Sequence, residues 1–199
     1  MRLSPEQLQE ISELERRFGR PVRVDALING FFDPIRRPDR IGEVCMVVRR
    51  PNGKLLLSIK TFYPRGAYRL PTGGIDHGES ILAAVLRETA EETGLETEVR
   101  RFVAQIAYRP RSEPGGQPIF HTFAFLLDEL GGTLGSRDEH EQIEEYIEVD
   151  PAELRSVADR LEHVTSEHSA DIGGDWADWG EFRAVVHRAV ADALGGVTV

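Results

Sequence analysis

The sequence predicts an α/β protein in which helices pack against a sheet, and three observations support this prediction. Apolar runs of strand length recur along the chain, the clearest at residues 44–48. Between two groups of such runs stands one segment with helical periodicity, residues 80–94. Further amphipathic segments stand near the two ends, at residues 4–18 and 178–194. Strands, a central helix, more strands and terminal helices are the order expected of layered α/β structure.

Composition and charge limit the classes of protein to consider. The chain has 199 residues, enough for one domain with a full core, or for one domain with an extension. Its net charge of −10 argues against non-specific binding to nucleic acid or anionic membranes. Cys45 is the single cysteine, so an intramolecular disulfide is impossible and a cysteine-based zinc site is not expected. No apolar run approaches roughly 18 residues and the first residues include charged ones, so we expect a cytoplasmic protein without membrane or nucleic-acid partners.

The first 40 residues are expected to form an N-terminal extension with a helix and a strand, ahead of a main domain at 41–199. Ser4 can cap a helix over residues 4–18, and Gln7 completes a capping box. The apolar stripe of this helix would consist of Leu8, Ile11, Leu14 and Phe18.

A short strand, a connector and a hairpin are expected next. Residues 22–27 alternate like a strand, and the proline-rich, charged stretch 33–40 predicts a connector. The main domain opens with a buried strand at 44–48. Residues 51–53, Pro-Asn-Gly, predict a tight turn, after which residues 55–59 would return as the hairpin partner of that strand.

The central helix carries Glu88, Glu91 and Glu92 on one stripe, because residues three and four apart share a helix face. Ser80 can cap its start, and Gly94 can end it in the left-handed conformation. Like charges at this spacing destabilise a helix, so a compensating partner is expected. A hard divalent cation that prefers oxygen ligands and leaves room for phosphates would compensate. A solvated acidic surface is the alternative interpretation of the glutamates alone.

Beyond this helix the chain alternates strands, loops and helices. A polar loop at 109–117 joins the first two strands, an acidic stretch at 137–145 precedes the third, and residues 165–177 are expected to be irregular. The expected elements are strands at 97–108, 118–127 and 146–149, and helices from Pro151 to about Leu161 and over 178–194.

The segment from Gly73 to Leu95 resembles the Nudix box, a pattern of glycine, glutamate, Arg-Glu, Glu-Glu and glycine-aliphatic at fixed spacings. The matching positions are Gly73, Glu79, Arg87, Glu88, Glu91, Glu92, Gly94 and Leu95. Thr89 departs from the pattern at an aliphatic position, and we expect it to face the core. The resemblance implies the Nudix fold, an α/β/α sandwich around a mixed β-sheet.

The same resemblance implies an enzyme that hydrolyses a phosphoanhydride of a nucleoside diphosphate linked to another moiety. Mg²⁺, or Mn²⁺ in its place, would be the cofactor. The implied metal ligands are the Thr72 backbone carbonyl, Glu79, Glu88, Glu91 and Glu92, the last three also being candidates for the base. Arg87 would orient a carboxylate through a charge-assisted hydrogen bond.

A further carboxylate is expected as the base for the attacking water, because the box glutamates would all engage the metal. In many relatives such a glutamate comes from a loop late in the fold. The acidic loop here offers Glu139, Glu141 and Glu144, of which we favour Glu141. If none of them acts, the base must be Glu88.

Arginines and a tyrosine in loops near the box are the candidate substrate contacts, because they can hold phosphates and stack on a base. These residues are Arg65, Tyr68, Arg69, Arg109 and Arg111. Pro110 lies where the family associates a proline with hydrolysis of ADP-ribose. The resemblance therefore favours the branch of ADP-ribose pyrophosphatase-like enzymes.

Other interpretations stay open at this point. One is a house-cleaning hydrolase of nucleoside triphosphates or dinucleoside polyphosphates, and another is a non-catalytic domain that senses a nucleotide. An isomerase of isoprenoid diphosphates would need a catalytic cysteine, whereas Cys45 lies in an apolar strand. The fourth interpretation is a structural protein whose helix happens to be acidic. The oligomeric state is open as well, and a homodimer, with or without exchange of the N-terminal segment, is one alternative.

Overall fold

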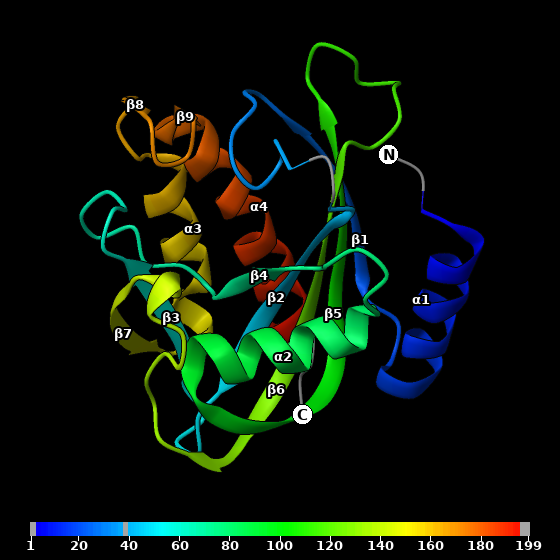
Figure 1. Cartoon of the computed structure of the whole chain (residues 1–199), viewed down its shortest axis with the longest axis vertical. Helices are drawn as coiled ribbons and strands as arrows, with labels where there is room; N and C mark the ends of the chain where they lie inside the picture. The colour runs from blue at the N-terminus through cyan, green and yellow to red at the C-terminus, as the bar shows by residue number, and fades with distance from the viewer. Residues whose placement is uncertain (1–2, 38–39, 196–199) are drawn as a thin grey trace.

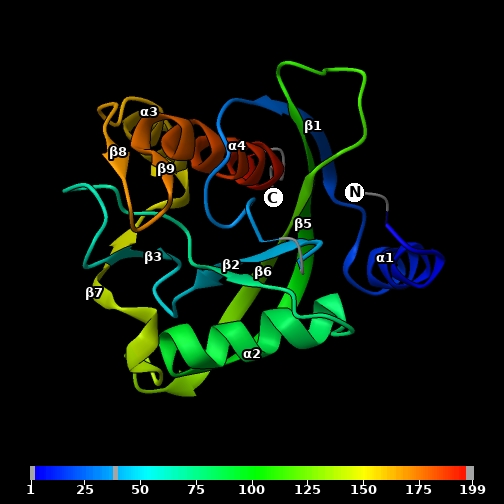
Figure 2. The same cartoon turned by 45° about the horizontal axis from the view of Figure 1, so that its top comes forward.

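The structure, a computed structural model, describes residues 3–37 and 40–195, without the side chain of Glu139. It is an α/β/α sandwich: one mixed sheet lies between α2 on one face and α3 and α4 on the other (Figures 1 and 2). The helices are α1 (Pro5–Phe18), α2 (Ile81–Thr93), α3 (Leu154–Glu162) and α4 (Trp176–Gly195), with short 3₁₀ turns at Glu139–Glu141 and Pro151–Glu153. The predicted α/β class and the layers implied by the Nudix resemblance are thus confirmed.

Within the described residues the main sheet has seven strands, of which six follow the order β1-β5-β6-β2-β3-β7 while β4 pairs with β2. The strands are β1 (Val22–Ile28), β2 (Gly42–Arg49), β3 (Leu55–Lys60), β4 (Thr72–Gly74), β5 (Leu95–Pro110), β6 (Phe120–Gly132) and β7 (Ile143–Val149). Two short strands, β8 (His168–Ser169) and β9 (Gly174–Asp175), form a separate ribbon. The pairs β1–β5 and β2–β6 are parallel and the others are antiparallel.

Strand β2 shows why its sequence is apolar at every position. Val44, Met46 and Val48 pack on the side of α1 and α2, whereas Cys45 and Val47 pack on the side of α3 and α4. All five side chains are fully buried, because successive residues of a strand point to opposite faces and both faces are covered here.

The predicted hairpin of β2 and β3 forms only at its turn, and the reason is a segment inserted between the two strands. The antiparallel register of β2 with β3 is confined to Arg49 and Leu55. Farther from the turn, Arg69 exchanges both backbone hydrogen bonds with Ser58 of β3, and the Met46 N–H of β2 donates to the Pro71 carbonyl at 2.9 Å. The chain just before α2 therefore runs between the two strands.

The N-terminal residues join the same sheet, since β1 runs parallel to β5 from Val22 opposite Ala104 onward. Helix α1 has the predicted capping box between Ser4 and Gln7. Its apolar stripe is shorter than expected: Ile11 and Leu14 are buried, but Leu8 is 53% exposed. Among the described residues, no helix combines the length and the apolar character that crossing a membrane requires.

Candidate active site

Helix α2 begins and ends where its local sequence predicts. The Ser80 hydroxyl accepts a hydrogen bond from the Ala83 N–H, and Gly94 ends the helix at a positive φ of 67°. Thr89 is fully buried, and its hydroxyl donates to the Val85 carbonyl at 2.5 Å. The departure from the box pattern thus affects packing in the core, as expected.

Arg87 holds three carboxylates in fixed positions. Its Nε and Nη2 donate to the two oxygens of Glu79 at 2.8 Å each, and its Nη1 donates to Glu88 and Glu91 at 2.9 Å each. Nη2 also donates to the Gly74 carbonyl at 3.0 Å. These hydrogen bonds lower the pKa of Glu79. One guanidinium therefore ties the start of the box to the helix, and offsets the repulsion that we predicted among the helix glutamates.

Gly73 makes room for Glu88. A Cβ at this position would lie 2.0–2.2 Å from the end of the Glu88 side chain, far inside van der Waals contact. Glu88 is only 6% exposed, and its burial raises the pKa of its carboxyl group in spite of Arg87. The glycine of the box is thus explained by close approach of its backbone to a buried carboxylate.

Glu92 is the most deeply buried of the helix glutamates, at 1% exposure. Among the described residues its Oε2 atom has no hydrogen-bond partner. Burial raises the pKa of Glu92 to about 7; Arg69 and Lys60 lower it, while Glu141 and Glu88 raise it. A buried carboxylate oxygen without a donor costs folding free energy unless a ligand completes it.

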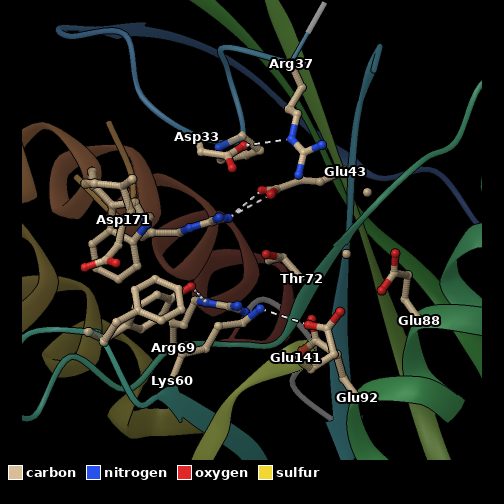
Figure 3. Close-up of a pocket in the computed structure, with 18 of the residues that line it drawn as sticks. Asp33, Arg37, Glu43, Lys60, Arg69, Thr72, Glu88, Glu92, Glu141 and Asp171 are labelled. Carbon is tan, nitrogen blue, oxygen red and sulfur yellow. Dashed lines mark hydrogen bonds and ion pairs between the residues drawn. The ribbon is translucent and has the colours of Figure 1, made fainter. Parts of the chain in front are cut away.

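Glu141 joins Glu88 and Glu92 from the turn before β7. Carboxylate oxygens of these three residues all lie within 4.8 Å of one another, close enough to share one metal ion (Figure 3). Lys60 at the end of β3 donates from its Nζ atom to Glu141 Oε2 at 2.8 Å. The structure therefore brings Glu141 to the box, whereas Glu144 is exposed and the side chain of Glu139 lies outside the described part.

The three glutamates face a cavity of about 270 Å³ that is also lined by cationic side chains (Figure 3). Thr72, Gly73 and Gly74 of β4 form part of its wall. Its cationic lining residues are Arg37, Arg40, Lys60, Arg69 and Arg183, and its acidic ones are Asp33, Glu43, Glu88, Glu92, Glu141 and Asp171.

Of the candidate substrate contacts, only Arg69 lines this cavity. Arg65 lines an adjoining surface groove, and the Tyr68 hydroxyl bonds to Glu145 instead. Arg109 pairs with Asp25 of β1, and Arg111 pairs with Glu181 of α4. The polar loop at 109–117 therefore lies beside β1, and none of its residues lines the cavity within the described part of the chain. Glu79 and Glu91 also stand outside the lining, bonded to Arg87.

Sequence analysis did not single out several residues of the cavity. Glu43 and Arg183 form a buried ion pair with distances of 2.7 and 2.9 Å, and Lys60 holds Glu141. The sequence signal that could have identified Glu43 is its position as a charged residue at the start of an otherwise apolar strand. Cys45 lies deep in the core, where burial raises the pKa of its thiol, so it lacks the reactive thiolate that an isomerase would need.

The fold and the site together define a layered α/β domain with a charged cavity lined by three clustered carboxylates, two buried and one half-buried. The chain belongs to the NUDIX domain family, whose model matches residues 39–170.

Individual relatives are more distant. The chain is 33% identical over 98 residues to an ADP-ribose pyrophosphatase of Methanocaldococcus jannaschii, a match covering 49% of this chain and 56% of the relative. It is 33% identical over 95 residues to the NAD-capped RNA hydrolase NudC of Vibrio atlanticus, covering 48% and 33% of the two chains. These matches span about half and a third of the relatives' own lengths. A crystal structure of an ADP-ribose pyrophosphatase from Streptococcus suis has a TM-score of 0.47 at 17% identity, covering 79% of this chain and 92% of that one.

Proposed function

We propose that this protein is a divalent-metal-dependent hydrolase that cleaves the phosphoanhydride of a nucleoside diphosphate linked to another group. The observation that carries the proposal is the convergence of Glu88, Glu92 and Glu141, with oxygens within 4.8 Å of one another, in a cavity that also offers cations. Such an arrangement suits a metal ion together with an anionic substrate.

The residues present fit Mg²⁺ or Mn²⁺. All three groups are carboxylates, the donor type that these hard cations prefer. A cation would also complete the Oε2 of buried Glu92, to which no described residue donates a hydrogen bond. When bound, the metal would withdraw charge from the phosphoryl oxygens and increase the acidity of the attacking water.

The chain's own side chains would position the reaction and move the proton. Arg87 keeps the Glu88 carboxylate fixed, so that it need not reorganise when substrate binds. Glu141 is our candidate for the base: Lys60 holds one of its oxygens, and its other oxygen can accept the proton of the attacking water. The Thr72 carbonyl remains our candidate for a further metal ligand, because Thr72 lines the cavity.

ADP-ribose is the substrate that we favour. The relatives named ADP-ribose pyrophosphatase and NAD-capped RNA hydrolase share, by name, substrates with a nucleoside diphosphate joined to a second group. The chain covers only part of each relative, so its substrate has to be determined on the chain itself.

A panel of nucleotides, with products identified by mass spectrometry, tests this function. We expect ADP-ribose to yield two monophosphates in the presence of Mg²⁺ and nothing in the presence of chelator. Release of pyrophosphate from nucleoside triphosphates, with ADP-ribose untouched, would instead assign the protein to the triphosphate hydrolases. Nucleotide binding without cleavage of any compound would indicate a sensor domain.

A further inference from the structure

Arg69 is a buried cation without a carboxylate partner. Its side chain is 1% exposed, and among the described residues no carboxylate forms an ion pair with it. Its hydrogen bonds go to neutral groups: Nε donates to the Tyr63 hydroxyl at 3.2 Å, and Nη1 donates to the Leu70 carbonyl at 2.9 Å. Because a guanidinium has five N–H donors and stays charged, the site retains capacity for an anion.

Arg183 offers a second buried donor on the wall of the same cavity. It is 4% exposed, and its Nη1 atom donates to both oxygens of Glu43. The Thr122 hydroxyl also donates to Glu43, so this carboxylate is well satisfied. The Nε atom of Arg183, in contrast, is buried and has no partner among the described residues. Buried donors in native proteins are normally paired, so this atom indicates an interaction with a ligand or water.

Aromatic rings and a histidine fix the two arginines relative to each other. The guanidinium of Arg69 lies 5.5 Å from the Tyr63 ring, the Tyr63 and Trp179 rings lie 4.8 Å apart, and the guanidinium of Arg183 lies 5.9 Å from the Trp179 ring. All four residues line the cavity. They form one continuous wall, which we call the arginine wall.

His187 connects the two segments that carry this wall. Its Nε2 accepts a hydrogen bond from the Leu70 N–H at 2.9 Å, and its Nδ1 lies 2.8 Å from the Arg183 carbonyl. Burial lowers the pKa of His187 to about 3, so the ring is neutral near pH 7. With Nε2 accepting, Nδ1 carries the hydrogen and donates to Arg183. The wall is therefore held rigidly before any ligand binds.

We propose that the arginine wall is an anion-binding site, in which Arg69 and Arg183 hold the oxygens of a substrate phosphate in the cavity that the three glutamates also line. This inference rests on the proposed function for the identity of the anion. A guanidinium matches the geometry of phosphate oxygens, and a pair fixed in advance loses little conformational entropy on binding. Arg183 lies on α4, outside the residues 39–170 that the family model matches, whereas Arg69 lies within them.

Binding of inorganic pyrophosphate without metal tests the wall independently of hydrolysis. With chelator present the glutamates repel the anion, so binding measured by isothermal titration calorimetry must come from the cationic residues of the lining. The variants are Arg69→Gln and the double change Glu43→Gln with Arg183→Gln, which replaces the buried ion pair by two neutral amides. Arg188→Gln is the matched control, because Arg188 lies on the same helix and pairs with Asp159 and Glu162 at the surface.

We expect the wild type and Arg188→Gln to bind pyrophosphate equally, and each wall variant to bind at least about ten-fold more weakly. Circular dichroism and thermal unfolding without ligand check that each variant is folded. Arg69→Lys keeps the positive charge but lacks the forked guanidinium, so it should bind pyrophosphate with intermediate affinity. Equal binding by all folded variants, or no binding by the wild type up to about 20 mM pyrophosphate, would overturn the proposal. A protein that binds through the wall but cleaves nothing would refute only the proposed function.

Discussion

Replacing Glu92 by glutamine should stabilise the metal-free protein at alkaline pH while removing most of its hydrolytic activity. The carboxyl group of Glu92 is 1% exposed and its Oε2 lacks a partner among the described residues. Ionising such a group in the folded protein costs free energy, whereas in the unfolded chain it ionises freely in water. Glutamine has nearly the same shape and never carries that charge.

The size of the effect follows from the pKa. Burial, the largest cause, raises the pKa of Glu92 from 4.5 to about 7. Below pH 4.5 the group is protonated in both states and has no effect. Between 4.5 and about 7 only the unfolded state ionises, so the wild type loses stability as pH rises, and above that range the loss is constant at on the order of 3 kcal/mol.

Urea-induced unfolding between pH 4 and pH 8.5, with chelator present, measures this difference. The stability gap between Glu92→Gln and the wild type should open from near zero to about 3 kcal/mol. Glu113→Gln, a change in an exposed loop, should show no such gap. A gap that is independent of pH, or a wild type that is the more stable protein at pH 8, would show that the carboxyl group is not buried as an unpaired acid.

Metal should reverse the order of stability. Mg²⁺ at 1,000 times its dissociation constant should stabilise the folded wild type by about 4.1 kcal/mol, which exceeds the gap of about 3 kcal/mol in favour of the variant. The Glu92→Gln variant lacks one of the three carboxylates, so Mg²⁺ should stabilise it much less. If this folded variant turned over substrate at nearly the wild-type rate, the box could not be the catalytic site.

Three further substitutions test the cluster. Gly73→Ala should lower kcat about 100-fold and also destabilise the fold by on the order of 1–3 kcal/mol, because the new methyl group displaces the buried Glu88 side chain. Gly135→Ala, where a Cβ meets nothing within 4 Å, is the control, and equal rates would refute the steric explanation. Arg87→Lys loses the forked guanidinium that orients the carboxylates. The Mg²⁺ concentration that gives half-maximal activity should therefore rise about 10–100-fold, and an unchanged concentration would count against this orienting role. Glu141→Gln should lower kcat about 100-fold with KM unchanged, while exposed Glu144→Gln should not; a normal kcat in Glu141→Gln would return the role of base to the helix.

Local sequence was sufficient to predict helix α2 but not the arrangement of β2 and β3. The limits of the helix depend on Ser80 and Gly94, whose capping interactions involve neighbours only a few residues away. The predicted hairpin pairs only next to its turn, because residues 69–74 occupy the space beside the rest of β2. Turn chemistry at residues 51–53 fixes how the hairpin starts, and it carries no information about a segment inserted farther along.

The difference between local and long-range contacts also decides which residues of the site the sequence could predict. The box glutamates share one helix, so their proximity follows from helical periodicity. Chain order alone gave little basis for choosing Glu141 over the other glutamates of its loop. The ion pair that holds Glu141 in place is with Lys60, which lies 81 residues away in the sequence. Glu43 and Arg183 are 140 residues apart, a separation at which no periodic pattern relates two positions. Arg109 and Arg111 looked equivalent to Arg69 in the sequence, but the sheet directs them towards Asp25 and Glu181.

The inserted segment also explains how an acidic cluster and a cationic wall share one small cavity. It runs from Arg69, bonded to β3, through Pro71, bonded to β2, to Gly73 against Glu88. Five residues thus carry the chain from the arginine wall to the three-carboxylate cluster, held between two strands. A change at Arg69 would alter what anion is held, and a change at Gly73 would alter how the carboxylate is placed. Because α4 supplies Arg183, the other half of the wall, a change at Arg183 should leave the acidic cluster in place and alter how the anion is held.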